Sequence, residues 1–339
     1  PGNYDGRFLG PLTMRQALAQ SRNVPAVKML YLVGLRDAIT LARDLGITSL
    51  REAGFYGLTL VLGGGEVRLL DMVGAYGVFA NDGLRVPHTP LLEVRDSEGT
   101  VLEKHEPRAQ RIVDAEAART VSSILSDNAA RTPLFGSNSF MYFGDHYDVA
   151  AKTGTTNSNR DAWLVGYTPR LAVGVWSGNN DNSPMQKGSS ISGPAWRDFL
   201  NFALPRTERR RFVPPAPTSA SLKPALRGVW QGNESLVVDS VSGKLATDLT
   251  PPETRVEIVI PDAHTILHWV QPGNPQGPIP ADPTNESQYE NWEWSVQQWL
   301  LENQASSAGV ELALLTALAR SEEHTSELQS PCNLVCRLL

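Results

Sequence analysis

Three runs rich in β-branched and aromatic residues follow one another closely near the middle of the chain, and they constrain its fold more than any other feature. The runs cover residues 149–155, 161–168 and 171–177. The turns between them, at Asn157-Ser158-Asn159 and Pro169-Arg170, are too short for a helical crossover, so consecutive strands should pair antiparallel. Because predicted helices precede this meander, helices should pack on an antiparallel sheet, which gives an α/β (α+β) fold.

Helical spacing and capping signals place several helices ahead of the sheet. Thr13 and Gln16 have the capping-box pattern, and the helix that they begin should end near Ser21. Pro25 suits the first position of the next helix, and Gly34 suits its left-handed cap. The predicted helices cover residues 13–21, 25–33, 37–45, 66–80 and 114–125, and a hairpin joins 91–95 to 100–102.

The composition changes after residue 204 and divides the chain into parts. Residues 1–204 form the main predicted domain. Residues 205–226 are rich in proline and include three consecutive arginines, which favours an extended, solvated linker. Residues 227–319 form a small C-terminal extension with two strand candidates and the tryptophan-rich helix NWEWSVQQWL. These tryptophans can belong to the core of a small domain or can stack on glycan, and the sequence does not decide between the two.

The last twenty residues, 320–339, do not resemble the rest of the chain. Their first ten, RSEEHTSELQ, match the in-frame translation of a sequencing-adapter oligonucleotide, and a natural disordered terminus is the alternative interpretation. We therefore expect residues 320–339 to be an artefactual tail and exclude them from the fold. Both cysteines, Cys332 and Cys336, lie in this tail.

Composition excludes several classes of function. The formal net charge of -6 argues against broad nucleic-acid binding, which needs a basic face. No apolar run reaches the ~18–20 residues of a membrane-spanning helix. The six histidines form no HExxH pattern, and the part before the tail contains no cysteine, so nothing supports a zinc site or a disulfide framework. We expect no metal and no organic cofactor.

The segment Lys152-Thr153-Gly154-Thr155 on the first predicted strand carries the clearest chemical signal. The lysine ammonium can polarise a neighbouring hydroxyl and attract a carboxylate. The hydroxyls of Thr153 and Thr155 can donate to a terminal carboxylate, and Gly154 lets a substrate backbone approach the strand. An extended peptide can then pair with the strand. A lysine on a surface strand is the alternative, because three letters alone are a weak signal.

The sequence around this segment resembles the class A penicillin-binding proteins, whose transpeptidase domain is described by the motif set SxxK, SxN and KTG. The resemblance runs in family order through NYDGRFLGPLTMRQALAQSRNVPAVKML, LGGGEVRLLDMVGAYGVFANDG, AAKTGTTNSNRDAWLVGYTPRLAVGVWSGNNDN and GPAWRDFL. It covers about the first two hundred residues. It implies a penicillin-binding protein and serine β-lactamase-like transpeptidase fold for residues 1–204, incomplete at its N-terminal side.

Three segments have the SxN pattern. Ser21-Arg22-Asn23 lies between two predicted helices and well upstream of Lys152, as the family places its motif. Ser126-Asp127-Asn128 spells SDN, yet it stands close before the strand at a helix end. Ser177-Gly178-Asn179 follows Lys152, which is the wrong order. We assign the motif to Ser21 and Asn23.

No serine stands three residues before any lysine of the chain, so the SxxK nucleophile is absent from it. The family would place SxxK upstream of Pro1. We therefore expect the chain to be a C-terminal fragment that cannot form an acyl-enzyme. The resemblance also implies a parent that is extracytoplasmic, in the periplasm or on the outer face of the cytoplasmic membrane, and anchored by a missing N-terminal segment.

The resemblance implies a role for each candidate residue. In the parent, the SxxK serine would attack the D-Ala-D-Ala end of a peptidoglycan stem peptide, and β-lactams would inhibit as substrate mimics. Ser21, poised by Lys152, would relay a proton to the departing amine, and Asn23 would hold the substrate. Thr153 and Thr155 would bind the terminal carboxylate, and the Thr155 N–H would be half of an oxyanion hole.

Two other functions stay open at this point. A serine β-lactamase or D,D-carboxypeptidase uses the same motifs and delivers the acyl group to water instead of an amine. A non-catalytic cell-wall-binding or sensor module could keep the fold alone. The intact KTGTT and SRN segments argue against the second alternative, and the block RDAWLVGYTP favours the class A transpeptidase.

Overall fold

The computed structural model describes residues 2–186, 191–228, 235–259 and 263–302. The chain divides into two compact units, Pro1–Phe8 with Met14–Pro217, and Leu9–Thr13 with Thr218–Leu339. The predicted artefactual tail, 320–339, lies outside the described residues, and so does the end of the predicted C-terminal extension from residue 303. Among the described residues, no helix has the length and apolar character that a membrane crossing needs.

The first unit contains seven α-helices and seven strands among its described residues. Its helices are α1 (Met14–Ala19), α2 (Asn23–Val33), α3 (Leu35–Asp44), α4 (Leu69–Ala80), α5 (Ala115–Ser126), α6 (Asn128–Phe135) and α7 (Ser192–Ala203). Its strands are β1 (Leu84–Arg85), β2 (Glu93–Arg95), β3 (Val101–Lys104), β4 (Gln110–Arg111), β5 (Ala150–Thr155), β6 (Asp161–Thr168) and β7 (Leu171–Gly178). The predicted helices and the hairpin are confirmed with shifts of a few residues. Helix α6, which contains Pro133, and helix α7 were not expected.

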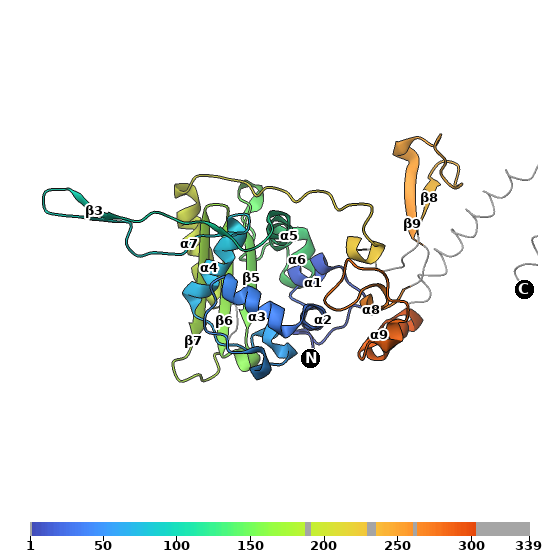
Figure 1. The fold of residues 1–339 in the computed structure, drawn as a ribbon, viewed down its shortest axis with the longest axis horizontal. Helices are drawn as coiled ribbons and strands as arrows, with labels where there is room; N and C mark the ends of the chain where they lie inside the picture. Colours follow the sequence, from blue (N-terminus) through green and yellow to red (C-terminus); the bar gives the residue numbers. More distant parts are fainter. Residues whose placement is uncertain (1, 187–190, 229–234, 260–262, 303–339) are drawn as a thin grey trace, which may run out of the picture. The chain divides into compact units, whose positions relative to one another are not determined.

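The predicted antiparallel meander is confirmed as the sheet β5-β6-β7. Helices cover both faces of this sheet. Successive residues of a strand point to opposite faces, so neighbouring residues show which helix packs on each face. Ala150 and Tyr167 pair across β5 and β6 and pack with Leu125 of α5. Ala151, the next residue, packs instead with Trp196 of α7. Figure 1 shows the sheet between α4 and α7.

Trp196 is the centre of the core between α7 and the sheet. Its side chain is fully buried, and its indole N–H donates to the carbonyl of Val173 at 3.1 Å. Gly166 of β6 makes room for it, because a Cβ at this position would lie 2.5 Å from the indole ring. The close approach of α7 to the sheet therefore requires a glycine opposite a large aromatic residue.

Replacing Trp196 with alanine is expected to lower the free energy of unfolding by about 3–5 kcal/mol, because a large buried side chain leaves a cavity. Phe199→Ala is the matched control, since Phe199 lies on the same helix and is half exposed. Its cost should stay below ~1 kcal/mol. Urea unfolding of the two variants measures both values, and equal losses would contradict this packing.

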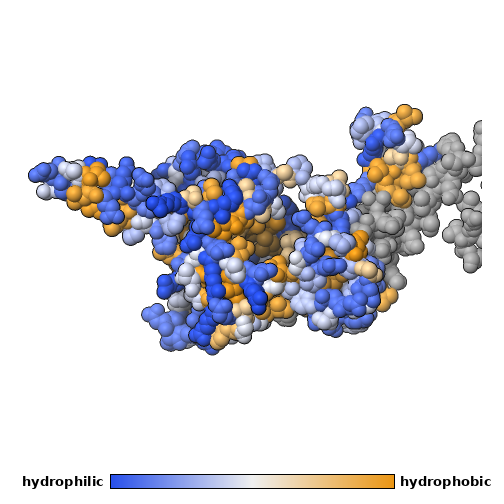
Figure 2. Space-filling model, in the orientation of Figure 1, coloured by the Kyte–Doolittle hydropathy of each residue, from blue (hydrophilic) through white to orange (hydrophobic). Residues whose placement is uncertain are grey.

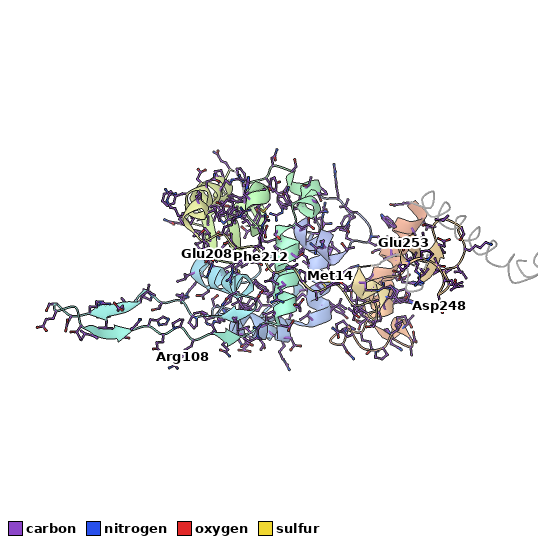
Figure 3. The ribbon with its side chains drawn as sticks, turned by 90° about the horizontal axis from the view of Figure 1, so that it is seen from above. Met14, Arg108, Glu208, Phe212, Asp248 and Glu253 are labelled. Carbon is purple, nitrogen blue, oxygen red and sulfur yellow. The ribbon has the colours of Figure 1, made fainter. Side chains whose placement is uncertain are left out.

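The boundary between the units falls inside the predicted linker, 205–226, and its first part packs on the first unit instead of crossing solvent. Phe212 contacts Tyr167 edge to face with ring centroids 5.6 Å apart, and its backbone N–H donates to Asp148. Arg211, from the arginine run, forms an ion pair with the same Asp148. Figure 3 labels Glu208 and Phe212 over the body of this unit. An aromatic residue among the arginines therefore anchors the segment.

The hairpin of β2 and β3 extends from the first unit, as Figure 1 shows. Its exposed side chains include Leu91, Leu92 and Leu102. Figure 2 shows the corresponding hydrophobic patches on this projecting segment.

The second unit combines a hairpin with two helices among its described residues. Strands β8 (Ser235–Asp239) and β9 (Arg255–Val259) lie at the two strand candidates, and they pair antiparallel. Helix α8 (Ile266–Trp269) contributes buried Leu267 and Trp269, and α9 (Tyr289–Glu302) is the tryptophan-rich helix. Trp294 is exposed, whereas Trp299 packs on Gly10. The tryptophans of α9 therefore divide between packing and surface.

Candidate active site

Strand β5 places the Lys152 to Thr155 segment at an edge of the sheet. Among the described strands it pairs only with β6, with Lys152 opposite Val165 and Thr155 opposite Ala162. The other edge of β5 pairs with no described strand. An extended peptide can add to such an edge by backbone hydrogen bonds. The position thus fits the peptide-binding use that the sequence predicts.

Lys152 and Ser21 meet at this edge although 131 residues separate them in sequence. The Nζ of Lys152 donates to the Oγ of Ser21 at 2.6 Å and to the carbonyl oxygen of Thr153 at 2.9 Å. The predicted proximity of the SRN turn to the lysine is therefore confirmed. Both side chains are partly buried.

The packing of the helices explains why these two residues meet. Strand alternation puts Lys152 on the same face of β5 as Ala150, which packs with α5. Helix α1 also packs on α5, and the turn from α1 to α2 contains Ser21. A common partner helix thus brings the turn to the lysine.

Burial lowers the pKa of the Lys152 amine from its ordinary 10.5 to about 8. Desolvation penalises the charged form of the amine, and it is the cause of the lowered pKa. At neutral pH the amine still carries its proton, so it can act as a hydrogen-bond donor to Ser21. A small change of environment can deprotonate it, which suits a group that takes part in proton transfer.

Lys152→Met is expected to raise the melting temperature at pH 7 by a few degrees, because it removes a desolvated charge from the folded state. Since the folded pKa is depressed, the unfolded chain binds more protons between pH 8 and 10.5, and the stability of the unsubstituted protein rises through this window. The difference in melting temperature between Lys152→Met and the unsubstituted protein should therefore become smaller above pH 8. Calorimetry across pH measures it, and a lower melting temperature for the variant at pH 7 would contradict this account.

Lys152 contacts the backbone carbonyl of Thr153, but no described hydrogen bond joins it to the side chain of a predicted site residue other than Ser21. Asn23 begins α2, and its side-chain amide donates to the carbonyl oxygen of Gly2 at 2.9 Å. Thr153 and Thr155 alternate to the opposite face of β5 from Lys152. A Cβ at Gly154 would lie 3.2 Å from the Cβ of Trp163, so a neighbouring side chain also favours glycine there. The substrate-binding roles of these residues stay predictions.

A network that the sequence did not identify shapes the turn after β5. The side chain of Asp161 accepts from Thr156 Oγ1 at 3.0 Å and from the indole N–H of Trp176 at 2.9 Å. The turn between Thr156 and Asp161 contains Ser158 and Asn159 in left-handed backbone conformations. The block NSNRDAW indicates a turn next to Asp161, but nothing in the sequence alone links this carboxylate to a tryptophan on β7. The network fixes the end of β5 at which Thr155 lies.

The two rejected SxN segments have structural roles. Ser126 Oγ donates to the carbonyl oxygen of Ser122, four residues earlier in α5. The Asp127 side chain caps α6 by accepting from the N–H of Ala130. Asn179 follows β7 and donates to the carbonyl oxygen of Ser183. The assignment of Ser126 to a helix end therefore agrees with its contacts.

Comparison with known families identifies the first unit. The family model described as the penicillin-binding protein transpeptidase domain matches residues 2–201. The chain belongs to this family. The match covers Ser21, Lys152 and the whole β5-β6-β7 sheet.

Curated relatives in this family are bacterial penicillin-binding proteins. Penicillin-binding protein 1A of Neisseria lactamica is 33% identical over 212 residues, which are 60% of this chain and 26% of the relative. Penicillin-binding protein 2D of Bacillus subtilis is 33% identical over 223 residues, or 63% of this chain and 31% of the relative. The chain therefore spans about a quarter to a third of the length of these relatives.

Solved structures show the same fold. PonA1 of Mycobacterium tuberculosis in complex with penicillin V has a TM-score of 0.55 and 25% identity, over 63% of this chain and 62% of that one. Penicillin-binding protein 1A of Haemophilus influenzae has a TM-score of 0.53 and 20% identity, over 76% of this chain and 41% of that one. The penicillin-binding transpeptidase fold expected from the sequence is thus confirmed.

Proposed function

We propose that this chain forms the SxN and KTG side of a peptidoglycan D,D-transpeptidase site that β-lactams also occupy. The observation that carries the proposal is the 2.6 Å hydrogen bond from Lys152 Nζ to Ser21 Oγ, beside a strand edge that pairs with no described strand. The pair joins the motif lysine to the motif serine, and it lies where an extended stem peptide can bind. Family membership and the penicillin complex of PonA1 support the same reaction.

The proposed reaction needs a nucleophile that this sequence does not contain. The serine of an SxxK segment attacks the carbonyl carbon of the penultimate D-alanine, and the amide C–N bond to the last D-alanine breaks. The serine proton passes to the leaving amine through Ser21, whose hydroxyl Lys152 polarises. An amine of a second stem then attacks the ester; the crosslinking amide forms, the ester C–O bond breaks, and a proton of the attacking amine passes to the serine oxygen.

The terminal carboxylate of the stem peptide determines where it binds in this proposal. In this proposal the hydroxyls of Thr153 and Thr155 donate to the carboxylate once the peptide lies along β5, and the Lys152 ammonium, on the other face of the strand, attracts it by charge without contact. Asn23 holds the other side of the substrate. The developing oxyanion takes backbone N–H donors, one of them from Thr155. The reaction takes place outside the cytoplasm, where peptidoglycan and β-lactams are found.

The experiment uses the SxxK version, defined as this chain preceded by an SxxK-bearing segment from its own reading frame or from a relative. It receives a donor stem peptide ending in D-Ala-D-Ala, with and without an acceptor amine, and mass spectrometry follows the products. Crosslinked dimer with release of D-alanine is the expected result. Hydrolysed donor alone would favour the D,D-carboxypeptidase alternative, and unchanged donor would favour the β-lactamase or the non-catalytic wall-binding module.

A further inference from the structure

Ser21 occupies a backbone position that usually belongs to glycine. Its φ is 54°, in the left-handed region. The N–H of Ser21 donates to Leu18, and the N–H of Arg22 donates to Ala17 at 2.9 Å, which is the Schellman arrangement at the end of α1. A side chain at this position strains the backbone, and such strain persists only where neighbouring contacts hold it. The contacts that hold this serine therefore bear on its role.

Arg22 ties the turn to the N-terminal segment. Its side chain is buried, and its Nη1 donates to both carboxylate oxygens of Asp5, at 2.9 and 2.8 Å. The Nε of Arg22 is buried without a hydrogen-bond partner among the described residues. Hydrogen bonds from the Arg7 backbone and from Arg22 lower the pKa of Asp5, so this carboxylate is charged at neutral pH. The guanidinium thus depends on Asp5 for its charge compensation.

Asn3 holds the other side of the same turn. Its Oδ1 accepts from the backbone N–H of Asn23 at 3.0 Å and of Val24 at 3.4 Å, which caps the N-terminus of α2. Its Nδ2 donates to the carbonyl oxygen of Arg7 at 2.7 Å, and Asp5 accepts from the N–H of Arg7. Asn3 and Asp5 therefore belong to one small hydrogen-bonded loop.

We propose that Asn3 and Asp5 form a clasp that positions Ser21 against Lys152. The clasp fixes Arg22 and Asn23, the two residues that follow Ser21, and so holds the strained serine with its hydroxyl on the lysine amine. Neither clasp residue touches Lys152, so both are positioning residues. The catalytic importance of this clasp rests on the proposed function, in which Ser21 relays a proton. The geometry itself can be tested without that reaction.

The test measures the Lys152 pKa in the chain as it stands. Competitive labelling of lysines with acetic anhydride at a series of pH values, followed by mass spectrometry of the peptides, gives this pKa. In the unsubstituted chain it should lie near 8. In Asp5→Asn the turn should open, water should reach the amine, and the pKa should move toward 10.5, with a roughly tenfold smaller acid dissociation constant. A merely structural loss of stability would leave the pKa of the folded protein unchanged.

Two further variants keep the result interpretable. Asp198→Asn removes an exposed carboxylate of α7 and should leave the Lys152 pKa at its original value. Asn3→Ala removes the N-terminal cap of α2 but leaves the ion pair of Arg22 with Asp5. It therefore replaces Asp5→Asn in the measurement if that variant does not fold. It should move the pKa in the same direction. An unchanged Lys152 pKa in whichever clasp variant folds would overturn the proposal.

The acylation rate of the SxxK version separates this inference from the proposed function. Asp5→Asn, or Asn3→Ala in its place, should slow labelling by a fluorescent penicillin roughly tenfold, and should have no further effect when Ser21→Ala is already present. A shifted Lys152 pKa without any labelling of the SxxK version would support the clasp and contradict the proposed function. Equal slowing with and without Ser21 would contradict the clasp.

Discussion

A fluorescent penicillin is expected to leave the chain as it stands unlabelled and to label the SxxK version covalently, with about one molecule per chain. The chain contains Lys152 and Ser21 in contact, but no serine stands three residues before any of its lysines. Acylation needs that nucleophile and its backbone N–H, which supplies half of the oxyanion hole. Loss of the nucleophile alone leaves only residual catalysis from binding contacts.

Gel fluorescence and intact-protein mass spectrometry measure this labelling. Denatured protein and prior incubation with unlabelled penicillin are the controls for non-specific reaction. Stoichiometric labelling of the chain without SxxK would mean that it contains an unrecognised nucleophile, with Ser21 as the first candidate. That outcome would contradict the assignment of Ser21 as a proton relay.

Lys152→Ala in the SxxK version is expected to lower the second-order rate constant of acylation by about 10²–10³, the cost of losing one preorganised donor at a developing charge. Lys152 polarises Ser21 from 2.6 Å, and in the proposed site it also attracts the substrate carboxylate. A truncated side chain can do neither. The protein should nevertheless stay folded, because the charge that is removed is a desolvated one.

Lys104→Ala is the matched control, since Lys104 lies exposed on β3. Its acylation rate should equal that of the unsubstituted SxxK version. Stopped-flow measurements over a range of penicillin concentrations give the rate constants, and circular dichroism verifies the fold. Less than a threefold loss for Lys152→Ala would show that the lysine is a surface residue of the strand.

The sequence predicted the sheet well because its signals are local. Three short runs joined by short turns allow only an antiparallel meander, and the structure has β5, β6 and β7 at nearly the predicted bounds. Helix α6 was missed because Pro133 is a strong signal against a helix interior. The structure tolerates this proline in the last turns of a short helix.

The contact between Ser21 and Lys152 could be predicted only through the family resemblance. Nothing in the periodicity of either segment indicates a partner 131 residues away. The anchoring of the first part of residues 205–226 could not be predicted for a similar reason. Proline and arginine describe an extended backbone, but they do not show that Phe212 finds an aromatic surface around Tyr167.

The clasp and the Asp161 network were beyond sequence reasoning because both depend on tertiary geometry. Asp5 and Arg22 read as ordinary polar residues of a loop and a turn, and their pairing follows from the burial of the arginine. Ser21 gave no sign of its left-handed backbone, since a helix end in this conformation normally signals itself with glycine.

The central claim is that Ser21 belongs to the site of Lys152, and a comparison of two serines tests it most directly. The measurement is the acylation rate constant of the SxxK version with Ser21→Ala and, separately, with Ser126→Ala. Both serines precede an SxN asparagine, but only Ser21 contacts Lys152, whereas Ser126 bonds within α5. We predict a loss of about 10² or more for Ser21→Ala and no change for Ser126→Ala. An unchanged rate for Ser21→Ala with a large loss for Ser126→Ala would contradict the site described above.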